Sequence, residues 1–195
     1  PFTAEEQVNW DKYVARGGNL LILSEPKRQD VMSSVLEPFG VNLVSGILVR
    51  ATENYAPELI QAMPTDEASR LIYHFEDMRK YKSVVTMPSV SGLEYTTDKG
   101  FKVIPLFKTD SLVWNELQTT NFVDDTVTLD VKSGEVQKSY VTAIALTREV
   151  RNGEQKVMIF GDADCISNGE LSTGRKGIRA ANFSVIMGGF YWMSN

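Results

Sequence analysis

Short apolar runs alternate with helix-like segments along the chain. Residues 20–23 form a continuous apolar run, which is typical of a strand covered on both faces. The predicted helix before it begins with a capping box, in which Thr3 and Glu6 have the required spacing. A second predicted helix at 31–40 is followed by an apolar stretch at 41–49 that reads as one strand or two short ones. This rhythm predicts an α/β domain built in layers.

The last third of the chain predicts a hairpin and a closing helix. Apolar segments at 140–150 and 154–161 flank Asn152 and Gly153, a pair that favours a two-residue hairpin turn. Because the rest of the pattern suits parallel strands, we expect a mixed, mostly parallel sheet. Residues 178–193 predict a helix that is apolar around most of its circumference.

The sequence predicts a single domain over residues 1–195. Segment 50–135 is less regular, and we expect it to be an elaboration packed on the sheet, because no flexible linker flanks it. A helix that precedes a parallel strand normally crosses over from an earlier strand. We therefore also expect that this sequence was excised from a longer chain.

Composition excludes several classes of protein. The net charge is −5, from 25 acidic and 20 basic side chains, and the basic residues are scattered. A nucleic-acid binder usually has a basic stripe, so we expect no nucleic-acid partner. Cys165 is the single cysteine, which excludes an internal disulfide. The apolar runs are shorter than the roughly 20 residues that span a bilayer.

The first candidate site is the stretch "IFGDADCISN". Asp162 and Asp164 follow an apolar strand, close to where open α/β sheets bind ligands. In extended chain the two carboxylates point the same way, about 7 Å apart. Such a pair suits a hard cation, or hydrogen bonds to sugar hydroxyls or ammonium groups. Alternatively, Asp162 forms an Asx turn, and Asp164 or Asn168 caps the next helix.

Known catalytic motifs fit this stretch poorly. An EF-hand loop that started at Asp162 would have Ile166 and Ser167 at positions that need a polar ligand and a glycine. A haloacid-dehalogenase-type phosphatase needs further carboxylates on later strands, and no acidic residue follows Glu170. A Cys165–His74 pair is disfavoured, because the carboxylate next to the cysteine raises the pKa of its thiol.

A second candidate lies at Asp110 and Trp114. An aromatic ring beside polar groups at the edge of a sheet suits the lining of a pocket. The alternative is that Trp114 packs in the core.

The order of several pieces resembles a known family. These pieces are "FTAEEQVNWDKYVARGGNLLILSEP", "VLEPFGVNLVSGILV", "FKVIPLFKTDSLVWNE", "KVMIFGDADCISN" and "ANFSVIMGGFYWM". Together they resemble the auxiliary component of ABC-type transport systems implicated in gliding motility, found mainly in Bacteroidetes. The resemblance implies a three-layer, flavodoxin-like domain, similar to class I glutamine amidotransferases without their catalytic residues. It also implies the periplasmic face of the cytoplasmic membrane, with membrane attachment through segments outside this sequence.

These observations lead to one expected function and two alternatives. We expect a non-enzymatic accessory domain without cofactor or metal, whose partners are ABC permease and ATPase subunits, with an unknown small ligand as a further possibility. The candidate contact residues are Asp162, Asp164, Asn168, Asp110 and Trp114. The alternatives are a metal-assisted hydrolase that uses Asp162 and Asp164, and a carbohydrate-binding module.

Overall fold

Helices and short strands alternate through the computed structural model, which describes residues 2–123, 126–151 and 153–195. The helices are α1 (Ala4–Ala15), α2 (Gln29–Leu36), η1 (Glu37–Phe39), α3 (Asp66–Leu71), α4 (Tyr73–Lys80), η2 (Val131–Ser133), η3 (Asp164–Ile166), α5 (Asn168–Ser172) and α6 (Asn182–Ser194), where η marks a 3-10 helix. The strands are β1 (Leu20–Leu23), β2 (Val41–Leu43), β3 (Ile47–Val49), β4 (Leu59–Pro64), β5 (Val85–Pro88), β6 (Leu93–Tyr95), β7 (Lys102–Lys108), β8 (Trp114–Glu116), β9 (Val141–Val150) and β10 (Gly153–Phe160).

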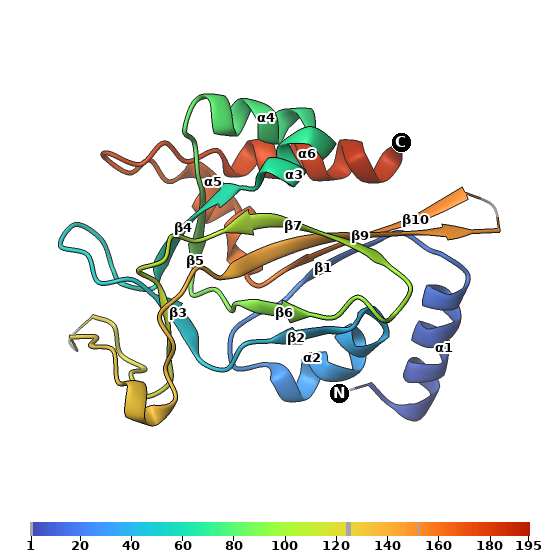
Figure 1. Ribbon diagram of the computed structural model, residues 1–195, viewed down its shortest axis with the longest axis horizontal. Helices are drawn as coiled ribbons and strands as arrows, with labels where there is room; N and C mark the ends of the chain where they lie inside the picture. Colours follow the sequence, from blue (N-terminus) through green and yellow to red (C-terminus); the bar gives the residue numbers. More distant parts are fainter. Residues whose placement is uncertain (1, 124–125, 152) are drawn as a thin grey trace.

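The main sheet has six strands in the order β1-β10-β9-β7-β4-β5 (Figure 1). Only β1 and β10 pair in parallel among its described strands, and each other neighbouring pair is antiparallel. The predicted α/β class and mixed sheet are confirmed, whereas the prediction of a mostly parallel sheet is wrong. The apolar runs were read as parallel strands because both of their faces are buried. Here the strands are antiparallel, but helices and a ribbon cover both faces of the sheet. Antiparallel strands buried on both faces have the same continuous apolar runs as buried parallel strands.

Segment 50–135 contributes more to the sheet than expected. It supplies β4, β5 and β7, three of the six strands, so this part of it does not pack on the sheet from outside. The apolar stretch 41–49 forms two strands, which join two separate ribbons, β2–β6 and β3–β8.

Two hydrophobic cores lie on opposite faces of the main sheet. Met158 and Phe160 pack with α3, α4 and α6, and their neighbours Val157 and Ile159 pack with α1 and α2. Figure 1 shows α3, α4 and α6 above the sheet, and α1, α2 and the β2–β6 ribbon below it. Because successive side chains of a strand point to opposite faces, β10 contributes to both cores.

Local signals in the sequence predicted several ends of elements. The Thr3 hydroxyl accepts a hydrogen bond from the Glu6 amide, and the Glu6 carboxylate accepts one from the Thr3 amide, so the capping box is confirmed. Strands β9 and β10 form the predicted antiparallel pair. Asn152, half of the predicted turn, lies outside the described residues.

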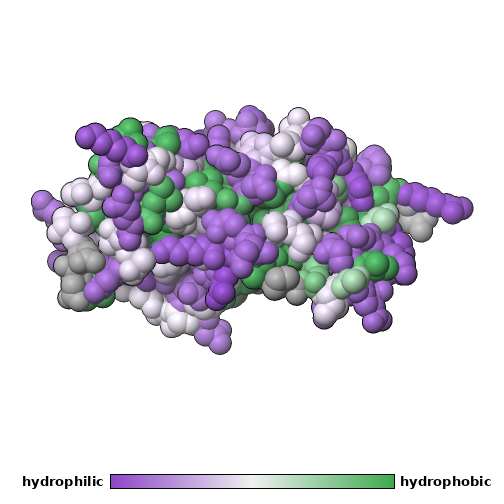
Figure 2. Space-filling model, turned by 90° about the horizontal axis from the view of Figure 1, so that it is seen from below, coloured by the Kyte–Doolittle hydropathy of each residue, from purple (hydrophilic) through white to green (hydrophobic). Residues whose placement is uncertain are grey.

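The surface on the α1 and α2 side is mostly hydrophilic, with apolar side chains scattered between polar ones (Figure 2). Among the helices of the described residues, none combines the length and the apolar character that a membrane span needs.

Candidate functional site

Strands β1 and β10 end side by side, and the candidate site follows these ends. Leu23 pairs with Phe160 in the parallel register. The Ser24 amide and hydroxyl both donate to the Phe160 carbonyl, at 3.0 and 2.7 Å. Glu25 and Asp162 therefore each lie two residues beyond a paired strand end, at the edge where open α/β sheets bind ligands.

Gly161 fixes the position of Asp162. Its amide donates to the Thr142 carbonyl at 2.9 Å, and its carbonyl accepts from the Ser91 amide at 2.9 Å. A Cβ at this position would lie 2.0 Å from the Ser91 carbonyl oxygen. Only glycine permits this close approach of two backbones.

Asp162 is fully buried, and only half of its carboxylate is satisfied. One oxygen, Oδ1, accepts from the Asp164 amide at 2.7 Å, which is the predicted Asx turn. The other oxygen, Oδ2, is buried without a hydrogen-bond partner among the described residues. Burial raises the pKa of Asp162 to about 8, and the charges of Glu25, Asp164 and Glu170 add to this increase, although the bond from the Asp164 amide opposes it.

Glu25 completes a cluster of three carboxylates. Oxygens of Glu25, Asp162 and Asp164 all lie within 4.8 Å of one another. The Ala163 amide donates to Glu25 at 3.2 Å and holds its side chain toward β10. Burial raises the pKa of Glu25, and the nearby Asp164 charge adds to this shift. Glu25 was not among the residues predicted from the sequence, and the available signal was its place just after the apolar run 20–23.

Asn168 and Asp164 do not cap the following helix. Ser167 is the N-cap of α5, and its hydroxyl accepts from the Glu170 amide at 3.1 Å. Asp164 begins η3, which has no side-chain cap. The capping part of the alternative is therefore wrong, because a serine between the two residues takes that role. Both Asp164 and Asn168 are exposed at this edge.

A buried polar network anchors the neighbouring helices. Asn182, at the start of α6, donates to the carbonyls of Thr86 and Cys165, both at 2.7 Å, and accepts from the Thr86 amide at 3.0 Å. Arg175 binds both oxygens of the buried Glu170, at 2.6 and 2.8 Å. With the hydrogen bond that the Thr86 hydroxyl donates to Glu170, these contacts join β5, η3, α5 and α6.

Cys165 and His74 do not form a nucleophile and base pair. The Cys165 thiol is fully buried and donates to the Asp162 carbonyl at 3.3 Å. Burial raises the pKa of this thiol, and the Asp162 charge raises it further. The His74 Nδ1 atom is buried without a hydrogen-bond partner in the described part of the chain. A protonated, buried thiol is a poor nucleophile.

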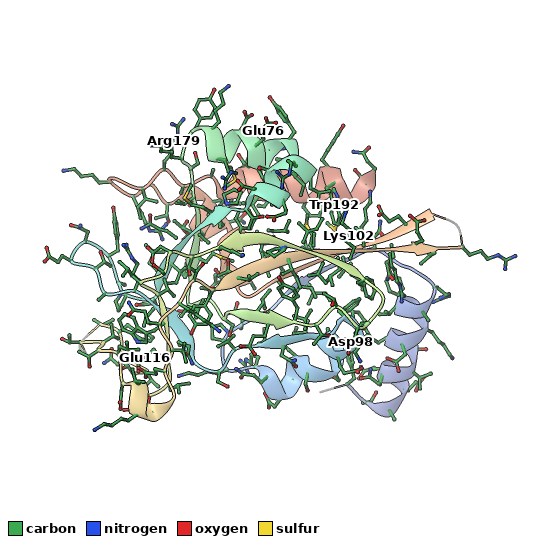
Figure 3. All side chains as sticks on the ribbon, viewed as in Figure 1. Glu76, Asp98, Lys102, Glu116, Arg179 and Trp192 are labelled. Atoms are coloured by element: carbon green, nitrogen blue, oxygen red, sulfur yellow. The ribbon has the colours of Figure 1, made fainter. Side chains whose placement is uncertain are left out.

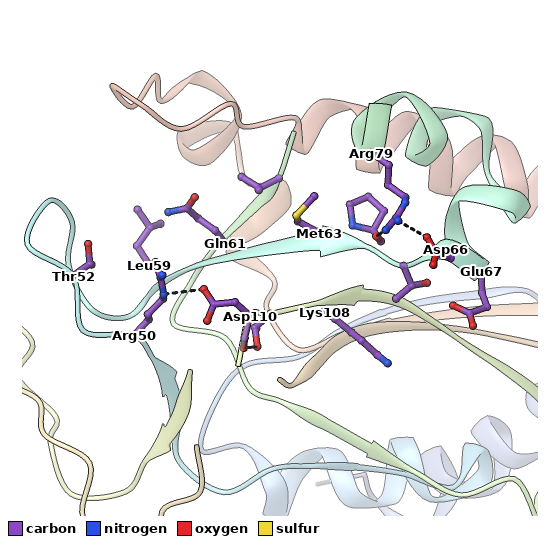
Figure 4. Close-up of a pocket in the computed structure, with 14 residues that line it drawn as sticks. Arg50, Thr52, Leu59, Gln61, Met63, Asp66, Glu67, Arg79, Lys108 and Asp110 are labelled. Atoms are coloured by element: carbon purple, nitrogen blue, oxygen red, sulfur yellow. Dashed lines mark hydrogen bonds and ion pairs between the residues drawn. The ribbon is translucent and has the colours of Figure 1, made fainter. Parts of the chain in front are cut away.

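Asp110 lies apart from this cluster, in an open groove of about 520 Å³ beside β4 and α3 (Figure 4). Arg50 Nε lies 2.8 Å from its carboxylate, and the Leu112 amide donates to it at 2.8 Å. Arg79 forms a second ion pair with Asp66, at the α3 end of the groove (Figure 4). Charges of opposite sign thus neutralise each other along the groove.

Trp114 is in the core, as the alternative predicted. It lies on β8 with 4% of its surface exposed, and it packs with Val49 and Val127. Its indole nitrogen donates to Glu116 at 3.3 Å. Figure 3 shows Glu116 at one end of the molecule, far from Trp192 on α6. Trp114 therefore belongs to a small hydrophobic cluster and is not among the residues that line the groove.

Comparisons with known proteins give one match. A family model described as "ABC-type uncharacterized transport system" covers residues 1–184. No curated protein matches the chain, and no solved structure does. The family match spans most of the sequence and includes both strands that carry the carboxylates. The chain therefore belongs to this family of auxiliary components of ABC-type transport systems.

Proposed function

We propose that the chain is a non-enzymatic accessory domain of an ABC transport complex of the gliding-motility type. We place it on the periplasmic face of the cytoplasmic membrane, in one complex with the permease and ATPase subunits. Family membership over residues 1–184 is the observation that carries this proposal. The buried Cys165 thiol, with its raised pKa, supports a role without a covalent nucleophile.

The proposed partner surface lies where η3 and α5 meet α6. These elements pack against one another, and α6 occupies the outer layer of the molecule (Figure 1). Four large apolar side chains of α6 are 45–65% exposed, namely Phe183, Met187, Phe190 and Tyr191. Asp164 and Asn168 are exposed beside the start of this helix. An apolar stripe bordered by polar groups has the anatomy of a protein interface, and we assign its occupant as the permease subunit.

This proposal corrects the role first expected of Asp162. Its side chain is fully buried, so it cannot contact a macromolecular partner directly. Its contribution would be to hold the exposed Asp164 in place through the Asx turn.

Copurification from the native host tests the proposal. A tagged copy of the protein, extracted from membranes in mild detergent, should enrich ABC permease and ATPase subunits in quantitative mass spectrometry. The double variant Phe190→Ser and Tyr191→Ser should lose this enrichment and keep its melting temperature, because both side chains are exposed.

Val131→Ser is the matched control, since Val131 is 71% exposed but lies on η2, away from α6. Its enrichment should equal that of the wild type. Failure of the wild type to enrich ABC subunits would contradict the accessory function. Equal enrichment by the α6 double variant would contradict the proposed surface.

A metal-assisted hydrolase is the second candidate, because Glu25 joins the two predicted aspartates within 4.8 Å. It requires hydrolysis that depends on added Mg²⁺ or Mn²⁺ and disappears in Asp164→Asn. A panel of phosphate and carboxylic esters, assayed with each metal, tests this candidate. The carbohydrate-binding module stays a prediction, which a glycan array would test. The residues described as lining the groove include no aromatic ring on which a sugar would stack.

A further inference from the structure

We propose that Glu25, Asp162 and Asp164 bind one divalent cation at the carboxyl ends of β1 and β10, and that Ca²⁺ fits this site best. The inference does not depend on the transport partner, because all three ligands belong to this chain. It adds a third ligand, Glu25, to the aspartate pair that the sequence offered as one possible cation site, and it gives the accessory domain a metal site that its expected function did not include.

The first argument is the contrast between Asp162 and the other buried carboxylates. Glu116 and Glu135 are both almost fully buried. Both carboxylate oxygens of Glu135 accept hydrogen bonds from backbone amides. One oxygen of Glu116 accepts from backbone amides, and the other accepts from the indole nitrogen of Trp114. Glu170 is bound by Arg175 through both oxygens. Asp162 alone among these four leaves an oxygen, Oδ2, without a donor. A buried carboxylate without a donor is unfavourable unless a proton or a cation neutralises it, and a cation here would also neutralise Glu25 and Asp164.

The second argument is the geometry of the cluster. Ca²⁺ binds oxygen at 2.3–2.6 Å, so two oxygens on opposite sides of the ion lie about 4.6–5.2 Å apart. The three carboxylates offer oxygens within 4.8 Å of one another, which lets a single ion contact all of them. Ca²⁺ tolerates irregular coordination and a variable number of oxygen ligands, whereas Mg²⁺ demands a near-ideal octahedron with bonds of about 2.0–2.1 Å, so this irregular cluster favours Ca²⁺.

The third argument is charge and access. Among the described residues, no salt bridge within 4.0 Å neutralises any of the three carboxylates. Arg28 is exposed and acts on Glu25 only through its more distant charge. Asp164 is exposed and Glu25 is half-buried, so water molecules can fill the remaining positions around the ion.

Calorimetric titration of the EDTA-treated protein with CaCl₂, MgCl₂ and MnCl₂ tests the inference. The wild type should bind one Ca²⁺ with a Kd on the order of 10⁻⁴–10⁻³ M, the range of extracellular calcium modules, and the ion should raise the melting temperature. Glu25→Gln, Asp162→Asn and Asp164→Asn should each weaken binding at least about tenfold, since loss of even an outer-shell partner costs about 10–100-fold. Asp11→Asn on α1 is the matched control and should bind like the wild type.

Asp164→Asn keeps the test valid if Asp162→Asn fails to fold, because Asp164 is exposed. Two results would overturn the inference: no Ca²⁺, Mg²⁺ or Mn²⁺ binding by the wild type at about ten times that Kd range, or equal binding by the wild type and Asp164→Asn. Neither result bears on copurification with the permease, so the failure of one proposal is distinguishable from the failure of the other.

Discussion

Gly161 shows how one residue determines the geometry of the candidate site. The Cβ of Gly161→Ala would lie 2.0 Å from a backbone oxygen, which cannot move aside as a flexible side chain can. We expect the variant to lose about 1–3 kcal/mol of stability or more, the usual cost of overpacking. Urea denaturation measures this loss. Gly174→Ala is the control, because a Cβ at Gly174 meets no atom within 4 Å and should change the midpoint little.

The Asp162 carboxyl should make stability depend on pH in the metal-free protein. Its folded pKa, raised to about 8, exceeds the value of about 4 expected in the unfolded chain. Between these two values the folded state therefore holds more protons than the unfolded state. Stability should fall as pH rises from about 4 to 8, by at most about 1.4 kcal/mol per pH unit from this group.

Asp162→Asn isolates this contribution. The amide stays neutral, so the difference in unfolding free energy between variant and wild type should grow in favour of the variant as pH rises through this window. Glu25, Asp164 and Glu170 also act on Asp162, and they are unchanged in the comparison. Urea denaturation in EDTA at several pH values gives the two curves. Parallel curves would show that Asp162 titrates like an ordinary surface aspartate.

At the scale of elements, Asn182 holds the start of α6 against β5 and η3. Asn182→Ala removes the donors to the carbonyls of Thr86 and Cys165, which are buried. Leaving one such group unpaired costs about 1–3 kcal/mol, so we expect at least this loss of stability in urea denaturation. Asn182→Asp should destabilise no less, because a carboxylate has no N–H to donate. Asn54→Ala, at an exposed loop position, should be neutral.

The positions of elements could be predicted from the sequence better than their directions. Strands β9 and β10 form the predicted antiparallel pair, and α1 begins with the predicted capping box, because both depend on residues close to each other in the chain. Strand direction depends on which strands become neighbours, and burial of both faces gives parallel and antiparallel strands the same apolar pattern.

The same reasoning explains what was found and missed in the candidate site. Asp162 and Asp164 could be identified because they form a local motif after a strand. Glu25 is 137 residues from Asp162, and only the parallel pairing of β1 with β10 brings the two together. The residues next to Trp114 in the sequence do not reveal whether its side chain lies in the core or lines a pocket. Its packing partners Val49 and Val127 are distant in sequence.

At the scale of the whole molecule, the three tryptophans report on three different hydrophobic clusters. Trp192 packs above the main sheet, Trp10 packs against the core below it, and Trp114 belongs to the small cluster at the β3–β8 ribbon. The two large cores share β9 and β10, whose alternate residues point into each of them. One core therefore cannot unfold without disrupting the strands of the other.

Variants that keep a single tryptophan, with phenylalanine at the other two positions, should show this coupling in urea denaturation followed by fluorescence. Trp10 and Trp192 should report the same midpoint, as the single domain predicted for residues 1–195 requires. Trp114 should report an earlier change, because the β3–β8 ribbon has three residues in each strand and, among the described strands, forms a two-stranded sheet separate from the main sheet. Separate midpoints for Trp10 and Trp192 would instead indicate two independently folding units, and a coincident midpoint for Trp114 would show that the ribbon unfolds together with the sheet.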